Sequence, residues 1–296
     1  MRKEKMKFIR TMTLPLMIFS GTATLFAAAN PNDFASPATV EKFELTDGVT
    51  AYQYTFDELY GDPQIVSVIK ADLNNPAIET GIFACENKIR TTTSEMAGKA
   101  NAIAATNFGY FNMKDPSSPA GALKKADGTI ESTGSVGGDC TGYFSQTDGE
   151  ITISPTPPDF NAVDMARAGF PTLVNGSEIY RKIGTYDHIP GKHNRTAIGI
   201  TEDNILYLVV FDGRFKENAA GVSCYDLADF MQRLGCDAAL NMDGGGSSTM
   251  YIKDKGILNY PSDNRKFDHE GERRVYDIFF IRAEDAGNST AANDAE

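Results

Sequence analysis

Short β-prone runs separated by turn signals fill the first part of this chain and constrain its fold most strongly. The runs are VEKFEL, VTAYQYTF, IVSVIKA and AIETGIF, and the triplets TDG, GDP and NNP separate them. A candidate short helix follows from Thr92 to Lys99, and the apolar strand AIAATN comes after it. We therefore predict an α+β fold with mixed, largely antiparallel β-sheets and a few packed helices.

The first 29 residues have the layout of a secretory signal peptide. A basic start, MRKEKMKFIR, precedes the apolar run TMTLPLMIFSGTATLF and the small residues AAA. We expect an exported protein, periplasmic or secreted. The rest of the chain divides into a flexible lead-in (30–39), a single domain (40–283) with a strand-rich N-terminal part (40–100) and a motif-bearing part (101–283), and a flexible tail (284–296).

The charge balance limits the classes of partner. The whole chain has a net charge of −12, and removing the leader with its excess of four basic residues brings this to −16. Such an acidic protein is poorly suited to nucleic acid or to an anionic membrane surface. Any phosphate must therefore be bound locally by particular arginines. If the substrate is a sugar phosphate or a glycan, we expect arginines at its binding site.

Cysteine and histidine usage leaves the redox state open and argues against zinc. Export permits disulfides, and four cysteines allow three complete pairings between which the sequence does not choose: Cys85, Cys140, Cys224 and Cys236. There is no CxxC motif and there are three histidines, which gives a zinc cluster little support. We expect no cofactor, with a divalent cation left as an open alternative.

The segment from Arg195 to Arg214 has the pattern of a hairpin. The β-prone runs RTAIGI and ILYLVVFDGR flank the turn TEDN. Centring that turn near Asp203 pairs Arg195 with Phe211. This register places Arg195, Asp212 and Arg214 together at one end of the hairpin.

An amphipathic helix and another strand follow the hairpin. In SCYDLADFMQRLG, Ser223 is a candidate N-cap and Gly235 a C-terminal stop. The apolar positions repeat with helical spacing: Leu227, Phe230, Met231 and Leu234. The strand DAALNM comes next, so we predict a βαβ unit with parallel strands. Their C-terminal ends, carrying Asp212 and Asp243, should then meet at one edge of the sheet, where open sheets place ligands.

The stretch NMDGGGSSTM allows two interpretations. Glycines expose backbone N–H groups, so Gly244, Gly245 and Gly246, with the hydroxyls of Ser247 and Ser248, could form a nest for an anion. The competing interpretation is a glycine-rich hairpin between two strands. A carboxylate beside three glycines favours a site, because two residues would suffice for the turn.

Several side chains near this edge suit phosphate and sugar chemistry. The guanidinium groups of Arg195 and Arg214 match phosphate oxygens, and the carboxylates of Asp212 and Asp243 suit acid/base work. In TNFGYFN, Asn107 could bind a polar ligand and Tyr110 could stack on a sugar ring. The simpler interpretation of that motif is a bend with core aromatic residues.

Six motifs taken in order resemble those of the phosphodiester glycosidase family. They are NFGYF, FPTLVNG, RTAIGI, FDGR, ALNMDGGGSSTM and ERRV, and the resemblance covers residues 101–282. Two positions depart from the family pattern, since Phe108 stands where glycine is common and Arg274 where proline is common. The resemblance implies hydrolysis of a sugar 1-phosphodiester on the sugar side, releasing free sugar and a phosphomonoester.

This chemistry assigns a role to each candidate residue. Asp243 would be the base or nucleophile, and Asp212 a second carboxylate that holds an arginine or a water. Substrate binding would fall to these residues: Asn107, Tyr110, Arg195, Arg214, Gly244, Gly245, Gly246, Ser247 and Ser248. Two other functions remain open at this point. One is a non-catalytic glycan- or exopolysaccharide-binding protein, and the other is a metal-dependent phosphoesterase with a cation on Asp212, Asp243 and Asn241.

Overall fold

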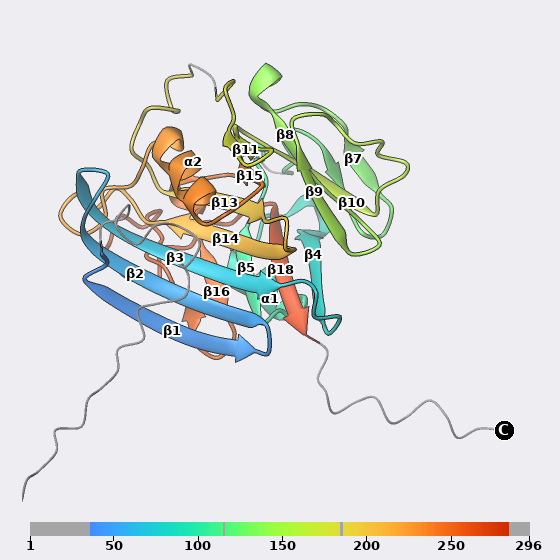
Figure 1. Ribbon diagram of the computed structural model, residues 1–296. Helices are drawn as coiled ribbons and strands as arrows, with labels where there is room; N and C mark the ends of the chain where they lie inside the picture. The colour runs from blue at the N-terminus through green and yellow to red at the C-terminus, as the bar shows by residue number, and fades with distance from the viewer. Residues whose placement is uncertain (1–35, 115, 184–185, 284–296) are drawn as a thin grey trace, which may run out of the picture.

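The computed structural model describes residues 36–114, 116–183 and 186–283. The expected signal peptide, most of the lead-in and the expected tail lie outside these residues. Three antiparallel β-sheets make up most of the described chain (Figure 1). Within this part of the chain every strand pairing is antiparallel, which fits the expected α+β fold with largely antiparallel sheets.

The largest sheet joins the strand-rich N-terminal part to the motif-bearing part. In spatial order its eight strands are β1 (Thr39–Thr46), β2 (Val49–Leu59), β3 (Asp62–Asp72), β14 (Ile205–Phe211), β13 (Arg195–Ile200), β15 (Ala238–Asn241), β11 (Thr172–Asn175) and β12 (Glu178–Ile179). The early strands are therefore continuous with the strands that carry the candidate site.

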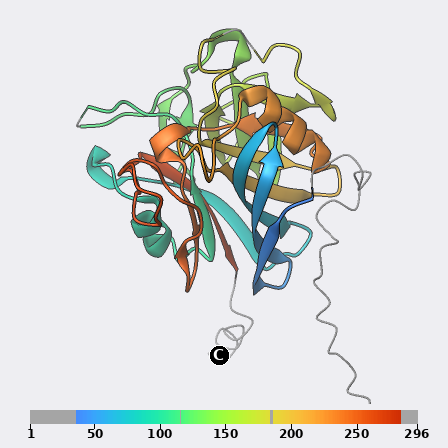
Figure 2. The same cartoon turned by 90° about the vertical axis from the view of Figure 1, so that its left-hand side faces the viewer.

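Two five-stranded sheets complete the β-structure. One has the order β7 (Ile130–Ser132), β6 (Leu123–Lys124), β10 (Met165–Gly169), β8 (Gly142–Thr147) and β9 (Glu150–Ser154). The other has the order β17 (Gly256–Ile257), β16 (Met250–Ile252), β5 (Ala104–Asn107), β18 (Asp277–Ala283) and β4 (Ile78–Ala84). In the turned view, the blue strands β1–β3 and the dark orange to red strands around β16 form separate layers (Figure 2).

The described residues contain two α-helices, and both begin where the sequence predicts. Helix α1 (Thr93–Lys99) follows its N-cap Thr92, whose side chain accepts a hydrogen bond from the Glu95 N–H. Helix α2 (Cys224–Arg233) has Ser223 as its N-cap in a reciprocal capping box with Asp226. Three short 3-10 helices are also present: η1 (Glu86–Lys88), η2 (Gly138–Cys140) and η3 (Gly245–Ser247).

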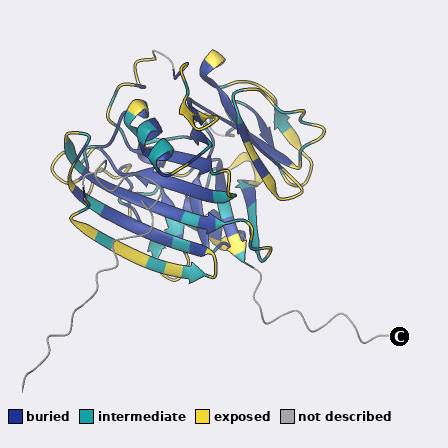
Figure 3. Ribbon diagram, viewed as in Figure 1, coloured by how far each residue is buried: buried dark blue, intermediate teal, exposed yellow. Residues whose placement is uncertain are grey.

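The central strands of the large sheet are buried on both faces, as their dark blue colour shows (Figure 3). Alternate residues of β14 point to opposite faces, so Leu206 and Leu208 enter one core and Tyr207 and Val209 the other. The first core lies between the large sheet and the two smaller sheets. The second lies under α2, whose predicted apolar positions are all buried: Leu227, Phe230, Met231 and Leu234.

The hairpin register is confirmed, and it fixes the edge at which the candidate residues lie. Arg195 pairs with Phe211. β13 is antiparallel both to β14 and to β15 and lies between them. The two strands joined by α2 therefore run in the same direction without being neighbours, which differs from a simple βαβ unit. Their C-terminal ends and the beginning of β13 lie at one edge of the sheet.

The four cysteines are buried free thiols, so the expected possibility of disulfides is not realised in this structure. Burial raises the pKa of the Cys85 and Cys224 thiols to about 11. Thiols of this kind behave as small apolar core groups.

Candidate active site

The glycine turn connects two sheets. β15 belongs to the eight-stranded sheet and β16 to a five-stranded sheet, with η3 between them. The two strands do not pair with each other, because β15 pairs with β13 and β11 whereas β16 pairs with β5 and β17. The hairpin interpretation is therefore wrong, and the turn is a crossing point between layers.

The glycines of the turn allow two arginines to approach its backbone. A Cβ atom at Gly245 would lie 2.8 Å from Nη2 of Arg214, and one at Gly246 would lie 2.4 Å from Nη2 of Arg273. Gly245 also has a φ of 63°, in the left-handed region that glycine favours. Side chains at these positions would displace the guanidinium groups, so the two glycines leave room for the arginines beside the turn.

The backbone of the turn is tied to protein partners. The N–H of Gly245 donates to the carbonyl oxygen of Asn194 at 2.9 Å, and a Cβ at Gly244 would lie 2.7 Å from the same oxygen. The hydroxyl of Ser248 is buried and accepts a hydrogen bond from Thr196. The Gly245 N–H and the Ser248 hydroxyl thus already bind protein atoms, and the anion nest expected over Gly244 to Ser248 stays a prediction.

Asp243 is partly exposed at the start of the turn. Its N–H donates to the carbonyl of Phe108, and its own carbonyl accepts from Nδ2 of Asn107 at 2.6 Å. The Oδ1 atom of Asn107 accepts from the Thr196 hydroxyl and from the Thr249 N–H. Asn107 is fully buried and holds the backbone of Asp243 through this contact, and its expected sugar-binding role stays a prediction.

The Asp243 carboxyl has a perturbed proton affinity. Burial raises its pKa to about 6. The hydrogen bond with Ser247, the positive charge of Arg273 and the N–H of Gly244 act in the opposite direction and favour the ionised form. A carboxyl that titrates close to neutral pH can both take up and release a proton under working conditions.

Asp212 is at the same edge but is fully buried. Its Oδ1 atom accepts hydrogen bonds from Nδ2 of Asn259 at 2.9 Å and from the N–H of Tyr260 at 3.0 Å. Burial raises its pKa to about 7, although these two hydrogen bonds lower it in part. Asp212 thus binds Asn259 and Tyr260 and not the expected arginine. These contacts place it beneath the loop that follows β17.

Arg195 is buried with its guanidinium group directed at carbonyl oxygens. It donates to Val222 at 3.1 Å, to His188 at 2.6 Å and to Gly191 at 2.7 Å. Three hydrogen bonds to the backbone thus already engage this side chain, and the expected phosphate clamp stays a prediction. Arg195 instead holds two loops against the beginning of β13.

Tyr110 also has a structural environment. Its hydroxyl donates to the carbonyl of Phe170 at 2.8 Å and accepts from Nδ2 of Asn241 at 2.9 Å. Burial raises its pKa well above the ordinary value, and its ring packs against the core under α2. Tyr110 is partly exposed and packs against the protein core, and the expected stacking on a sugar ring stays a prediction.

Arg214 and Arg273 share a pocket beside the glycine turn. The pocket has a volume of about 520 Å³, within the range of small-molecule sites. Its lining residues are Arg214, Phe215, Ser262, Asp263, Arg265 and Arg273. Arg273 donates to Asp263 and lies 3.4 Å from the hydroxyl of Ser247. Arg214, which the sequence analysis proposed for substrate binding, is thus one of the residues that line this pocket.

The loop between β17 and β18 supplies most of the lining, and the sequence pointed to only one of its residues. In the run DHEGERR the sequence allows Glu272 or Arg273 to reach the site, although an exposed turn is the simpler interpretation. Glu272 instead accepts hydrogen bonds from the N–H and hydroxyl of Ser94 at the start of α1. Asp263 and Arg265 lie before this run and belong to no motif that the sequence offered, so they were missed.

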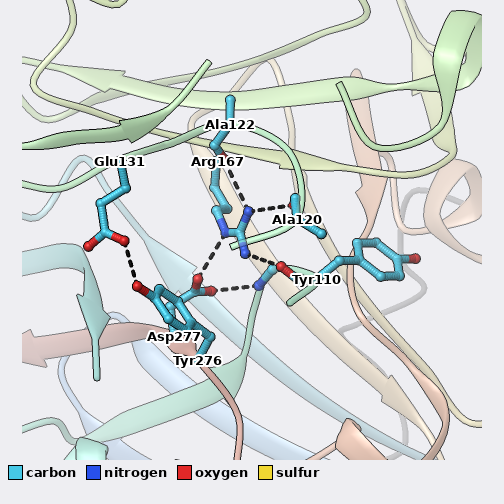
Figure 4. Close-up of polar contacts among 8 residues, drawn as sticks. Tyr110, Ala120, Ala122, Glu131, Arg167, Tyr276 and Asp277 are labelled. Carbon is cyan, nitrogen blue, oxygen red and sulfur yellow. Dashed lines mark hydrogen bonds and ion pairs between the residues drawn. The ribbon is translucent and has the colours of Figure 1, made fainter. Parts of the chain in front are cut away.

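A buried ion pair joins Arg167 to Asp277 close to the backbone of Tyr110 (Figure 4). Nε of Arg167 lies 3.0 Å from Oδ2 of Asp277, and both side chains are 0% exposed. The guanidinium also donates to the carbonyls of Tyr110, Ala120 and Ala122. This network explains a glycine of the NFGYF motif, because a Cβ at Gly109 would lie only 1.8 Å from Nε of Arg167.

Within the described residues, no group of three or more His, Cys, Asp or Glu side chains is arranged to hold a metal ion. Two of the residues proposed for a cation have protein partners on one side-chain atom: Oδ1 of Asp212 accepts from Asn259, and Nδ2 of Asn241 donates to the carbonyls of Phe170 and Met242. Oδ2 of Asp212 and Oδ1 of Asn241 are buried without a hydrogen-bond partner among the described residues. No helix in the described part of the chain is long and apolar enough to span a membrane.

Comparisons with solved structures show that the fold is shared. The catalytic domain of zebrafish N-acetylglucosamine-1-phosphodiester alpha-N-acetylglucosaminidase, auto-inhibited by its pro-peptide, superposes with a TM-score of 0.62 and 18% identity. The match covers 90% of this chain and 94% of that domain. A hypothetical protein from Synechocystis gives a TM-score of 0.61 at 14% identity, over 84% of this chain and 65% of that one.

Sequence comparisons establish the family. The bovine N-acetylglucosamine-1-phosphodiester alpha-N-acetylglucosaminidase is 26% identical over 202 residues, which cover 62% of this chain and 37% of the bovine protein. The chain therefore matches well under half of that relative's length. The family model described as phosphodiester glycosidase matches residues 100–282. On this match, the chain belongs to the phosphodiester glycosidase family of hydrolases.

Proposed function

We propose that this protein hydrolyses a sugar 1-phosphodiester at the bond between the sugar C1 and the phosphate oxygen. The products would be free sugar and a phosphomonoester. The observation that carries the proposal is the placement of Asp243, a partly exposed residue that begins a glycine turn with Arg214 and Arg273 beside it. Family membership supports the same reaction.

The proposed chemistry assigns separate roles to the carboxylate and the arginines. The leaving phosphate departs with the electron pair of the broken bond, and the two guanidinium groups stabilise that charge. Asp243 either attacks C1 or removes a proton from the water whose oxygen bonds to C1. Both roles require the ionised carboxylate, which the charge of Arg273 favours.

The remaining residues of the edge support this pair of functions. Asn107 fixes the backbone of Asp243, and Asp212 fixes the loop at Asn259 and Tyr260 that leads to the pocket. Arg195 holds the loops before β13 and α2. The glycines leave room for the arginines. This division replaces direct contacts from Asn107, Tyr110 and Arg195 with positioning roles.

The substrate and the location are also proposals. The name of the mammalian relatives specifies an N-acetylglucosamine 1-phosphodiester, so an N-acetylglucosamine-like sugar is the first one to test. The leader-like residues 1–29 support export.

The test is to incubate wild type and Asp243→Asn with a panel of sugar 1-phosphodiesters and to measure free sugar. Asp254→Asn is the matched control, because Asp254 is exposed, distant from the pocket lining, and has a φ of 67° that asparagine tolerates. We expect sugar release from wild type and the control, and a loss of at least about 1000-fold in Asp243→Asn, as for a group acting in the transition state.

Other outcomes separate the alternatives. Full activity in Asp243→Asn would overturn the assignment of this carboxylate. Binding of the substrate by wild type without any sugar release would favour a glycan-binding protein. Activity that a chelator abolishes and that releases sugar 1-phosphate instead of free sugar would favour a metal-dependent phosphoesterase.

A further inference from the structure

Arg273 reaches the glycine turn from a stretch of chain without regular secondary structure. β17 ends at Ile257 and β18 begins at Asp277, and residues 271–274 between them belong to no helix or strand. The guanidinium of Arg273 is paired with Asp263, but these two side chains are 25% and 38% exposed. Exposed ion pairs contribute little to holding side chains in one geometry. The position of Arg273 therefore depends on how its own backbone is anchored.

Two contacts tie the backbone around Arg273 to the beginning of α1. Before Arg273 in the chain, the carboxylate of Glu272 accepts hydrogen bonds from the N–H of Ser94 at 2.9 Å and from its hydroxyl. After Arg273, Val275 and Thr91 exchange two backbone hydrogen bonds of 2.8 Å and 3.1 Å. Arg273 thus lies between two contacts to one short segment, residues 91–94.

The contact of Glu272 places a carboxylate where a helix offers unpaired donors. Ser94 is the second residue of α1, so its N–H has no partner within the helix. The helix dipole favours a negative charge at this end, and hydrogen bonds to an ionised acceptor are stronger than neutral ones. α1 is itself fixed, because Met96 and Ala97 are buried in the core between the sheets. Glu272 therefore connects the chain beside Arg273 to a rigid part of the fold.

We propose that Glu272 is a positioning residue, whose contact with α1 holds Arg273 beside the glycine turn and Asp243. This inference rests on the proposed function, which gives Arg273 its part in the reaction. Glu272 is not among the residues that line the pocket, so it acts through Arg273 and not on the substrate. The beginning of α1, which is 178 positions away in the sequence, thereby contributes to the geometry of the site.

The titration of Asp243 reports where Arg273 lies. Burial raises the pKa of the Asp243 carboxyl to about 6, and the positive charges of Arg273 and Arg167 oppose this rise. If the guanidinium of Arg273 moves away, the pKa of Asp243 increases further. Loss of the negative charge of Glu272 alone would act in the opposite direction, because one carboxylate disfavours ionisation of another. The sign of the shift therefore distinguishes a displaced arginine from a missing carboxylate.

Glu272→Ala in the full chain tests the inference, and Glu95→Ala is the matched control. Glu95 lies in the first turn of the same helix, and its exposed carboxylate pairs with Lys99. We expect Glu272→Ala to lower kcat/KM about tenfold and to move the titration of Asp243, followed by ¹³C NMR of the free protein, to higher pH. Glu95→Ala should change neither quantity. A titration that stays in place or moves to lower pH in Glu272→Ala would overturn the inference.

Further variants separate positioning from a general loss of stability. In the Arg273→Gln background, Glu272→Ala should cause no additional loss of kcat/KM, because the residue through which Glu272 acts has already gone. Glu272→Gln should retain more of kcat/KM than Glu272→Ala, since its amide oxygen can still accept from Ser94. Ser94→Ala removes the hydroxyl donor alone, and this milder variant should shift the Asp243 titration in the same direction. Losses that multiply in the double variant would contradict the inference.

The failure of this inference can be distinguished from a failure of the proposed function, because the NMR titration requires no turnover. If wild type releases sugar from a sugar 1-phosphodiester but Glu272→Ala has the activity and the Asp243 titration of wild type, the positioning role falls and the glycosidase proposal stands. If no sugar 1-phosphodiester is cleaved while Glu272→Ala and Arg273→Gln both move the titration to higher pH, the glycosidase proposal falls and the positioning of Arg273 by Glu272 stands.

Discussion

Two arginine–aspartate pairs in this molecule have the same chemistry and different surroundings. Arg167 and Asp277 are both 0% exposed, and the other guanidinium donors bind three carbonyl oxygens. Arg273 and Asp263 are 25% and 38% exposed in the pocket, where Arg273 has only a long further contact with Ser247. The first pair holds the fold together, whereas the second keeps donors available for a ligand.

The same difference separates Arg195 from Arg214, although the sequence predicted the same phosphate-binding role for both. Arg195 is buried and engaged by backbone carbonyls, whereas Arg214 is exposed in the pocket with one long hydrogen bond. What distinguishes a binding arginine from a structural one is therefore whether protein acceptors already satisfy its donors.

The largest expected effect is on stability, at the buried pair. Arg167→Met removes the positive partner and leaves the Asp277 carboxylate buried, which should lower the free energy of unfolding by about 3–5 kcal/mol. Arg273→Met removes the partly exposed pair and should cost no more than about 1 kcal/mol. Urea denaturation of both variants measures the difference. Equal destabilisation would show that burial does not separate the two pairs.

Burial also affects the carboxyl groups at the sheet edge, and through Asp212 it makes the free energy of unfolding depend on pH. Burial raises the pKa of Asp212 to about 7 in the folded protein. Between about pH 4 and pH 7 the unfolded chain has already lost this proton while the folded chain retains it, so rising pH favours unfolding. The shift corresponds to a loss of up to about 4 kcal/mol over this window.

Asp212→Asn removes this titration and is the variant that tests it. Because the raised pKa of Asp243 also contributes to the decline, we expect the free energy of unfolding of Asp212→Asn to fall less steeply from pH 4 to pH 7 than that of wild type, measured by denaturation at fixed intervals of pH. A variant that declines as steeply as wild type would place the proton on another group.

Arg273→Gln should reduce activity with little change in stability. The substitution removes a charged donor from the phosphate side of the site, and we expect kcat/KM to fall about 10- to 100-fold. Arg282→Gln is the control, because Arg282 forms an exposed ion pair with Glu79 on the sheet that contains β4 and β18. A similar loss of kcat/KM in Arg282→Gln would show that the effect is not specific to Arg273.

The smallest expected effect is a shift in the pH profile. Because the role proposed for Asp243 requires the ionised carboxylate, kcat/KM should rise with pH through the pKa of about 6. The positive charge of Arg273 lowers that pKa, so Arg273→Gln should move the rising limb to higher pH. Rates measured from pH 4.5 to pH 8 show the limb. A limb that stays in place or moves to lower pH contradicts the proximity of these two groups.

Local patterns predicted the elements that position the site. The Arg195–Phe211 register and the apolar face of α2 follow from the turn TEDN and from helical spacing, and the structure confirms both. The shared direction of β14 and β15 predicts that Asp212 and Asp243 lie at the same edge of the sheet. Residues close in sequence determine each of these features.

Side-chain roles were harder to predict, because they depend on partners distant in sequence. The amide of Asn107 is taken by Asp243 and Thr196, and these contacts cross 136 and 89 positions. Asp263 and Arg273 lie beside Gly246 only because the loop after β17 folds back over the turn. No local pattern carries that information, so an acidic and basic run looked like an ordinary exposed turn.

The most direct test of the central claim is the position of the isotope after hydrolysis in ¹⁸O-labelled water. Attack at C1 places the label on the C1 hydroxyl of the free sugar and leaves the phosphomonoester unlabelled, as the account predicts. Mass spectrometry of both products gives the answer in a single turnover experiment. Label found in the phosphate would mean that water attacks phosphorus, and it would contradict the role proposed for Asp243.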